Sequence, residues 1–384
     1  MKHIIYNIGD LNIPGGIGRV VSMKANWLVE HGYKVTILTT EGQSVDSYYP
    51  LSDKIKTKCL NINFLTVYDN GRNIRGLLRS FFDRQSKAKK HHKALEVYLK
   101  ENPCDIFITT SHAPYITKLK DGSRKFFEIH FSVQSQKEFM LRSPMIFRLA
   151  YGLREKLRDR QLRKYDRFIV LTERDAALRG KHENMVVIPN FITVEPSKVG
   201  LNTTSKQVIS VGRLCEAKGF DYLFHAWKIV SQSYPDWHLN LYGHGYGREK
   251  EYQALIDELG LSGCISIHPP VRNIVEKYAE SAFYVMSSRY EGFPLVLGEA
   301  MSCGLPCVSY DCNCGPSDII RNGEDGILVD NVGDIKGLAD AILYMIGHPQ
   351  ERIRMGERAL NNVKRYSEDV IMKYMWTSLF DNKR

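Results

Sequence analysis

Two carboxylates stand eight residues apart in Ser287-Ser288-Arg289-Tyr290-Glu291-Gly292-Phe293-Pro294-Leu295-Val296-Leu297-Gly298-Glu299-Ala300-Met301-Ser302-Cys303-Gly304. Pro294 suits the first position of a helix and Gly304 suits a stop just past its end. The sequence therefore predicts a short helix with Glu291 at its mouth and Glu299 within it. A rise of about 1.5 Å per residue separates the two carboxylates by roughly 12 Å along the helix. That exceeds the ~5 to 9.5 Å of a glycosidase acid pair, so the spacing favours holding a long ligand over hydrolysing a bond.

A nucleotide sugar has the length that this spacing requires. One acid can accept the sugar hydroxyls and the other the ribose hydroxyls, while amides of Phe293, Leu295 and Val296 face the diphosphate between them. Pro294 has no amide hydrogen to contribute. An ordinary amphipathic helix with one solvated Glu would explain the stretch if it stood alone.

Two cations precede a second predicted helix in the same half of the chain. A strand at Gln207–Val211 is followed by Gly212-Arg213-Leu214 and then by Lys218-Gly219, which leads into a helix at Phe220–Ser231. Cations beside a helix N-terminus stabilise negative charge that develops on a departing nucleoside diphosphate. Two unrelated surface cations are a poor explanation at this spacing.

Together these motifs resemble those of family 4 glycosyltransferases, which are retaining enzymes with two Rossmann-like domains in the arrangement called GT-B. The resemblance implies that Arg213 and Lys218 hold the diphosphate, Glu291 orients the sugar hydroxyls and Glu299 holds the ribose. His130 follows a predicted strand, and the resemblance implies that it is the histidine that faces the cleft. His112 is a second candidate for this role. The residues that the resemblance places at the reacting centre are Glu291, Arg213, Lys218 and His130. Those it places around the donor are Glu299, Gly292, Phe293, Leu295, Gly243, Gly245, Val271, Gly15 and Gly16.

The chain opens with a predicted strand, a Gly15-Gly16-Ile17-Gly18 turn, a helix and a second strand, which is a βαβ unit. A dinucleotide-binding fingerprint would need a third glycine where Val21 stands. The sequence therefore disfavours an NAD-dependent oxidoreductase. For Gly18, close packing of helix on strand explains the residue as well as ligand binding does.

The predicted fold class is α/β, with two doubly wound Rossmann-like domains facing each other across a cleft. The first domain is expected at residues 1–190, the linker at 191–206 and the nucleotide-sugar domain at 207–365. A final helix within 366–384 is expected to cross back onto the first domain, as the resemblance implies. A length of 384 residues suits two such domains.

The composition of the chain bears on metal binding and on cellular location. Eight cysteines in no zinc-finger spacing indicate reduced thiols, and no bound metal is expected. The start of the chain does not resemble a signal peptide and no run of 18 apolar residues occurs, so the prediction is a cytoplasmic protein.

Positive charge is concentrated in the first half. Residues 1–195 carry 33 Lys and Arg against 20 Asp and Glu, whereas the remainder carries 20 against 23. Arg72–Lys93 has eight basic residues and one acid interleaved with apolar residues, a composition that can lie on an anionic membrane surface. For the similar segment Arg142–Arg167, a solvated helix packed on the sheet is the favoured reading. Nucleic-acid binding is a weaker alternative because no binding motif accompanies the charge.

The resemblance implies metal-independent transfer of a hexosyl group, with retention, from a nucleoside-diphosphate sugar, with UDP as the expected nucleotide. A basic first domain suggests a polyprenyl-diphosphate oligosaccharide as acceptor, as in capsule, O-antigen or exopolysaccharide assembly, with peripheral contact to the cytoplasmic face of the inner membrane. A soluble acceptor stays open. The alternatives are a nucleotide-sugar 2-epimerase of the same fold and a non-catalytic module that binds a nucleotide sugar or a membrane.

Overall fold

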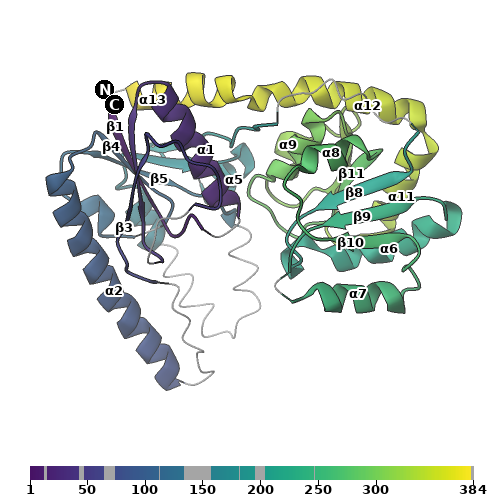
Figure 1. The fold of residues 1–384 in the computed structure, drawn as a ribbon, viewed down its shortest axis with the longest axis horizontal. Helices are drawn as coiled ribbons and strands as arrows, with labels where there is room; N and C mark the ends of the chain where they lie inside the picture. Colours follow the sequence, from purple (N-terminus) through teal and green to yellow (C-terminus); the bar gives the residue numbers. More distant parts are fainter. Residues whose placement is uncertain are drawn as a thin grey trace.

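A computed structural model describes residues 1–12, 15–42, 47–64, 74–111, 113–133, 157–180, 182–194, 204–245 and 247–381, with the side chains of 74–78, 80 and 81 excepted. Two separate parallel sheets organise these residues, one in each half of the chain (Figure 1).

The first sheet has seven strands in the order β3-β2-β1-β4-β5-β6-β7. Its inner strand β1 is buried along its whole length, which is typical of a parallel sheet covered on both faces. Strand order reverses between β1 and β4, and in open α/β sheets ligands bind at the carboxyl ends of the strands at such a point. The strands are β1 (His3–Ile8), β2 (Lys34–Thr39), β3 (Lys56–Cys59), β4 (Ile106–Thr109), β5 (Arg124–Glu128), β6 (Arg167–Val170) and β7 (Met185–Val187). Its helices include α1 (Gly16–Glu30), α2 (Ile74–Glu101) and α5 (Glu173–Arg179).

The second sheet has six strands in the order β10-β9-β8-β11-β12-β13 and reverses between β8 and β11. The strands are β8 (Gln207–Val211), β9 (His238–Tyr242), β10 (Ile265–His268), β11 (Phe283–Met286), β12 (Cys307–Tyr310) and β13 (Gly326–Val329). The helices are α6 (Phe220–Ser233), α7 (Glu249–Glu258), α8 (Ile274–Ala279), α9 (Leu295–Ser302), α10 (Pro316–Ile319), α11 (Ile335–Gly347) and α12 (Pro349–Asn362). The sequence predicts strands at 207–211, 238–242, 265–268 and 283–286 from short, largely apolar runs, and these are the bounds of β8, β9, β10 and β11.

The end of the chain returns to the first domain. In Figure 1 the yellow segment after α12 runs back along the molecule and ends beside the N-terminus. Trp376 is fully buried, and Phe380 of α13 (Thr377–Asp381) stacks on Phe126 of β5 with ring centroids 6.4 Å apart. These observations confirm the predicted α/β fold of two Rossmann-like domains with a C-terminal helix that crosses back.

Three details differ from the expectation. Strand β3 was not anticipated, because its residues Lys56–Cys59 are mostly exposed at the sheet edge and give no apolar pattern. Pro294 stands just before α9 with an extended ψ of 96°, so the helix begins at Leu295. Phe191 and Ile192, expected to open the linker, are buried, and the Ile192 amide donates to the Tyr366 carbonyl at 2.9 Å. This contact ties the start of the linker to the returning end of the chain.

Candidate active site

A hydrogen-bonded ion pair stands at the mouth of α9. Lys218 Nζ lies 2.6 Å from Glu291 Oε1, and the Ser288 hydroxyl donates to the same oxygen at 2.6 Å. The Lys218 side chain is 20% exposed and that of Glu291 is 12% exposed, so both are partly accessible to solvent. The two predicted residues, 73 positions apart in sequence, therefore form one charged centre.

Backbone geometry brings Lys218 to this place. Gly219 has a φ of +60°, and a Cβ atom there would lie 2.2 Å from the Ser287 carbonyl oxygen. The Ser287 hydroxyl also donates to the Lys218 carbonyl at 2.9 Å. Only glycine permits this approach, so the Lys218-Gly219 turn is held directly against the strand end that leads to Glu291.

Arg289 also binds the segment that follows Gly219. Its guanidinium binds the Asp221 carboxylate through two nitrogens at 2.9 and 2.6 Å and lies 4.1 Å from the centroid of the Tyr222 ring. Bidentate Arg–carboxylate pairs fix orientation as well as charge. Sequence reasoning did not use Arg289, because its partner lies 68 residues away.

Arg213 is exposed, and its side chain makes no hydrogen bond or ion pair with the part of the chain that the structure describes. The loop that carries it is packed tightly, since a Cβ at Gly243 would lie 1.9 Å from the Gly212 carbonyl oxygen. The Gly245 amide donates to Glu249 at 2.7 Å and the Gly247 amide to the same carboxylate at 2.8 Å. A carboxylate of α7 therefore accepts hydrogen bonds from amides in the loop of Gly243 and Gly245, two residues predicted around the donor.

A cavity of about 350 Å³ opens beside this loop. It is lined by Gly243, His244, Glu249, Lys250, Gln253, Ile267, His268 and Pro269. Val271, expected around the donor, lies two residues beyond this lining and is 36% exposed. The cavity is a place of suitable size for part of a nucleotide.

Glu299 is only 3% exposed and is paired across the two domains. Arg19 of α1 lies 2.5 Å from Glu299 Oε1, and the Tyr278 hydroxyl lies 3.5 Å from Oε2. Burial and the nearby Glu299 raise the pKa of Tyr278 well above its ordinary value. The carboxylate predicted to hold a ribose thus has a cationic partner in this structure, and a bound ribose would have to share or displace it.

His130 faces the donor motif through its backbone. A Cβ at Gly292 would lie 2.6 Å from the His130 carbonyl oxygen, so a loop of each domain touches the other at this point. The imidazole is 5% exposed, and its Nε2 lies 3.4 Å from Glu128 Oε1. Burial, opposed by Glu128 and assisted by Lys24, lowers the pKa of His130 to about 4.

The other predicted residues are placed as follows. Phe293 is buried and packs edge-to-face on Tyr366, with ring centroids 5.2 Å apart, while Leu295 is the first residue of α9 and is half-buried. The Gly15 amide donates to the Tyr49 hydroxyl at 3.2 Å, and Gly16, where α1 begins, is exposed. His112 lies outside the described residues.

Two family models match nearly the whole chain in succession. The model described as Glycosyltransferase Family 4 matches residues 14–196, and the one described as Glycosyl transferases group 1 matches residues 191–362. The chain belongs to the family 4 glycosyltransferases. The predicted GT-B fold and the resemblance to this family are thereby confirmed.

This glycosyltransferase is similar to two proteins in sequence over nearly their whole length and to a third in structure. It is 25% identical to an uncharacterized glycosyltransferase of Haemophilus influenzae, over 94% of each chain. It is 26% identical to the amylovoran biosynthesis glycosyltransferase AmsD of Erwinia amylovora, over 99% of this chain and 100% of AmsD. The crystal structure of Staphylococcus aureus TarM with fondaparinux, α-GlcNAc-glycerol and UDP matches with a TM-score of 0.76 at 17% identity, covering 99% of this chain and 100% of TarM.

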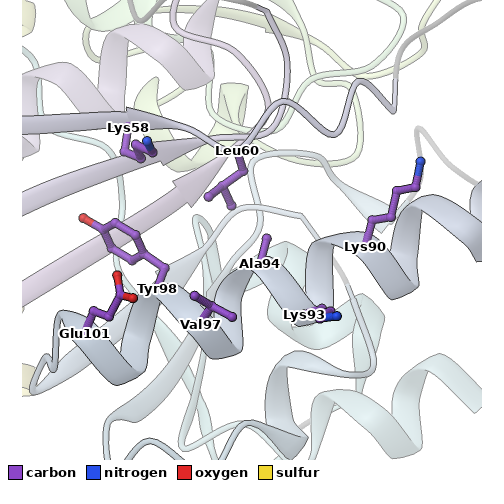
Figure 2. A pocket seen from close by; sticks show the side chains of 8 residues that line it. All are labelled: Lys58, Leu60, Lys90, Lys93, Ala94, Val97, Tyr98 and Glu101. Atoms are coloured by element: carbon purple, nitrogen blue, oxygen red, sulfur yellow. The ribbon is translucent and has the colours of Figure 1, made fainter.

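Outside the cleft, the glycosyltransferase has a basic groove between β3 and α2 (Figure 2). Its volume is about 480 Å³, and three lysines rim an apolar floor. It is lined by Lys58, Leu60, Lys90, Lys93, Ala94, Val97, Tyr98 and Glu101. Part of the predicted basic amphipathic segment thus lies on α2, whereas most of the second basic segment lies outside the described residues. Among those residues, no helix is both long and apolar enough to cross a bilayer.

The main site residue that sequence reasoning left out is Arg19. It directly follows the Gly15-Gly16-Ile17-Gly18 turn, whose first two glycines were predicted around the donor. Its partner Glu299 lies in the other domain, so no local pattern could have joined the two. Within the described residues, no cluster of three or more His, Cys, Asp or Glu side chains is arranged to hold a metal ion.

Proposed function

We propose that this glycosyltransferase moves a hexosyl group from a UDP-sugar to a glycan acceptor and retains the anomeric configuration. The observation that carries the proposal is the Lys218–Glu291 centre at the mouth of α9, with the His130 loop in contact with the adjacent Gly292. A cation for the leaving phosphate and a carboxylate for the sugar hydroxyls then stand at one point of the cleft.

In the proposed reaction the bond between the sugar C1 and the diphosphate oxygen breaks with its electron pair going to the phosphate. Arg213 and Lys218 stabilise the charge that develops on the departing UDP. The acceptor hydroxyl forms its bond to C1 on the same face, and its proton passes to the leaving phosphate oxygen. Since two cations carry the charge, we propose that no metal ion is required, and activity should persist in excess EDTA.

Two likenesses support the donor and the pathway. UDP is bound in the TarM structure, which shares this fold, and AmsD is a glycosyltransferase of amylovoran biosynthesis. We therefore propose a place in bacterial polysaccharide assembly, with a polyprenyl-diphosphate oligosaccharide as acceptor. A 2-epimerase would instead need acid and base groups beside the sugar, and Glu291 is committed to Lys218 and Ser288.

The test of the donor is a thermal-shift screen against UDP, GDP and ADP and the sugars of whichever nucleotide binds. Ligand at 100 times Kd adds about 2.7 kcal/mol of stability, which is a clear rise in Tm. UDP should stabilise the wild type and should not stabilise Glu299→Ala, whereas the matched surface variant Glu258→Ala should behave as wild type. Absence of a shift with every nucleotide would refute the donor proposal.

Transfer is then measured with the stabilising UDP-sugar and lipid-linked oligosaccharides extracted from bacterial membranes. UDP release that depends on acceptor indicates transfer, and the anomeric configuration of the product, read by NMR coupling constants, tests retention. Conversion of the donor sugar to its 2-epimer without acceptor would favour the epimerase.

We also propose that the groove between β3 and α2 meets the anionic membrane surface that carries the acceptor. Lys90→Glu with Lys93→Glu should abolish sedimentation with vesicles containing phosphatidylglycerol, and binding should weaken as salt rises. A control with Lys206→Glu and Lys336→Glu changes the same charge on two exposed lysines outside the first domain, one at the end of the predicted linker and one in the second domain. Equal vesicle binding by both variants would contradict this contact.

A further inference from the structure

A buried ion pair lies beneath His130. Lys24 of α1 and Glu128, the last residue of β5, are each fully buried, and Lys24 Nζ bonds to Glu128 Oε1. The same carboxylate oxygen lies 3.4 Å from His130 Nε2. One carboxylate therefore contacts both a lysine and the cleft histidine.

The strand geometry explains why Glu128 and His130 meet. Successive side chains of a strand alternate between faces, so Phe126 and Glu128 share one face and the chain continues in the same sense to His130. Phe126 on this face stacks on Phe380 of the returning C-terminal helix. Glu128 thus occupies a position that would otherwise be apolar core.

The returning end of the chain closes the cluster. Lys24 Nζ lies 4.3 Å from the centroid of the Trp376 ring, and Trp376 is fully buried. Tyr6 of β1 lies fully buried nearby, where burial and the charge of Glu128 raise the pKa of its phenol. A cation–aromatic contact helps to hold the lysine where no water can solvate it.

Stability alone does not explain this pair. A buried ion pair contributes little to stability compared with apolar residues of similar volume, because both charges lose their hydration. Two atoms of the cluster, Glu128 Oε2 and His130 Nε2, are buried without a hydrogen-bond partner among the described residues. Such unsatisfied polar groups are a cost that a functional arrangement explains.

We propose that Glu128, held by Lys24, is a positioning residue that accepts a hydrogen bond from the Nε2–H of His130 when the donor is bound. Contacts of this kind are often long in the absence of substrate and shorten in the complex. The bond selects the tautomer in which Nδ1 is the proton-free nitrogen, able to accept a hydrogen bond from a donor-sugar hydroxyl. Lys24 compensates the charge of Glu128, so the carboxylate orients the imidazole without stabilising its protonated, cationic form.

This inference rests on the proposed function, because it assigns His130 to the donor. The Lys24–Glu128 pair could orient His130 in the same way if the protein bound another ligand beside it.

The test compares two double variants that carry the same charge. Lys24→Met with Glu128→Gln keeps an oxygen acceptor beside Nε2, whereas Lys24→Met with Glu128→Leu removes it. Both avoid leaving one buried charge unpaired, so both should fold and melt no lower than the wild type. The expected kcat is within about threefold of wild type for the Gln variant and about 10- to 100-fold lower for the Leu variant, as for lost orienting partners of histidine ligands. UDP affinity should be equal in both.

Two further readouts separate positioning from structure. In a His130→Ala background the Gln and Leu variants should have the same kcat, because Glu128 acts only through His130. Histidine ¹⁵N NMR of the UDP-bound protein should show the Nε2–H tautomer at His130 in wild type and in the Gln variant, and not in the Leu variant.

Equal kcat in the two double variants, or the Nδ1–H tautomer in UDP-bound wild type, would overturn the proposal. If wild type transfers no sugar, the proposed function fails, while the NMR tautomer still decides the role of Glu128.

Discussion

The two domains of this protein differ at several of their glycines. At Gly219, Gly243 and Gly292 of the second domain, a Cβ would lie within 2.6 Å of a carbonyl oxygen, whereas at Gly9, Gly16 and Gly122 of the first it would meet nothing within 4 Å. The second domain shapes its side of the cleft with closely packed backbone. The first domain has no such constraint at these positions and supplies buried side chains instead.

Charge follows the same division. The Lys218–Glu291 pair is partly exposed to solvent, and the Lys24–Glu128 pair is completely buried. A charge that meets ligand has to stay accessible, while a charge that orients another group can be enclosed. The second domain therefore presents its charged groups on short sequence motifs, whereas the first domain encloses them in its core.

The sharpest test replaces one lysine from each pair. Lys218→Ala should lower kcat by about 10³-fold and leave Tm nearly unchanged, because a cation that acts on the leaving phosphate is worth roughly 3 to 4 kcal/mol in the transition state. Lys24→Ala should destabilise the fold by about 3 to 5 kcal/mol, since it leaves Glu128 buried and unpaired. Kinetics and urea unfolding measure both, with the exposed Lys228→Ala as control. Similar losses of stability in the two variants would break the comparison.

A second test adds one methyl group to the backbone cradle. Gly292→Ala forces the donor motif away from the His130 carbonyl and should lower kcat about 100-fold, because displacements near 1 Å at a reacting centre cost this much. Gly263→Ala, where nothing lies within 4 Å of the new Cβ, should be neutral. A Gly292→Ala enzyme with normal kcat would show that the two loops do not need to touch.

Acidification should affect the first domain before the second. Burial lowers the pKa of His91 and His130 to about 4, and the unfolded chain titrates near 6.5. The unfolded state therefore binds more protons between these values, so stability is fully present above pH 6.5 and falls as the pH drops toward 4. For His130 the full difference is on the order of 3 kcal/mol.

Fluorescence can report this order of unfolding. Trp27 and Trp376 lie in the first domain and Trp227 and Trp237 in the second, so pairs of Trp→Phe variants isolate each domain. His130→Gln should reduce the loss of stability between pH 7 and pH 5, and His348→Gln on the exposed end of α11 should leave it unchanged. Earlier unfolding of the second domain in acid would contradict the assignment.

The different physics of the two halves also explains what could be predicted from sequence. The residues around Gly212, Gly243 and Gly292 can be recognised as short sequence motifs. A close approach of two backbone segments requires glycine at a fixed place in the chain, so the glycine marks the motif. The four strands β8 to β11 were predicted with their bounds for a related reason, since each is a short, largely apolar run between clear turns.

Sequence patterns could not predict the Lys24–Glu128 and Arg19–Glu299 ion pairs. Their partners lie far apart in the chain, and a lone charged residue in a helix or at a strand end is read as a solvated one. Edge strand β3 was missed because its exposed lysines carry no apolar alternation. Local pattern predicts the elements and their motifs, and it does not show which distant charges a closed core brings together.

The smallest expected effect concerns the surface contact between the domains. Arg174 of α5 binds Asp311 at 2.7 Å and also contacts Ser317, and its side chain is 43% exposed. Exposed ion pairs contribute about 0.2 to 1 kcal/mol and are screened by salt. Arg174→Ala should therefore change unfolding by less than about 1 kcal/mol, with the difference lost in 1 M NaCl. We expect the contact between the domains to depend mainly on the Arg19–Glu299 ion pair and on the approach of Gly292 to His130. A larger loss of stability in Arg174→Ala that persists in high salt would mean that the exposed Arg174–Asp311 pair holds the domains together instead.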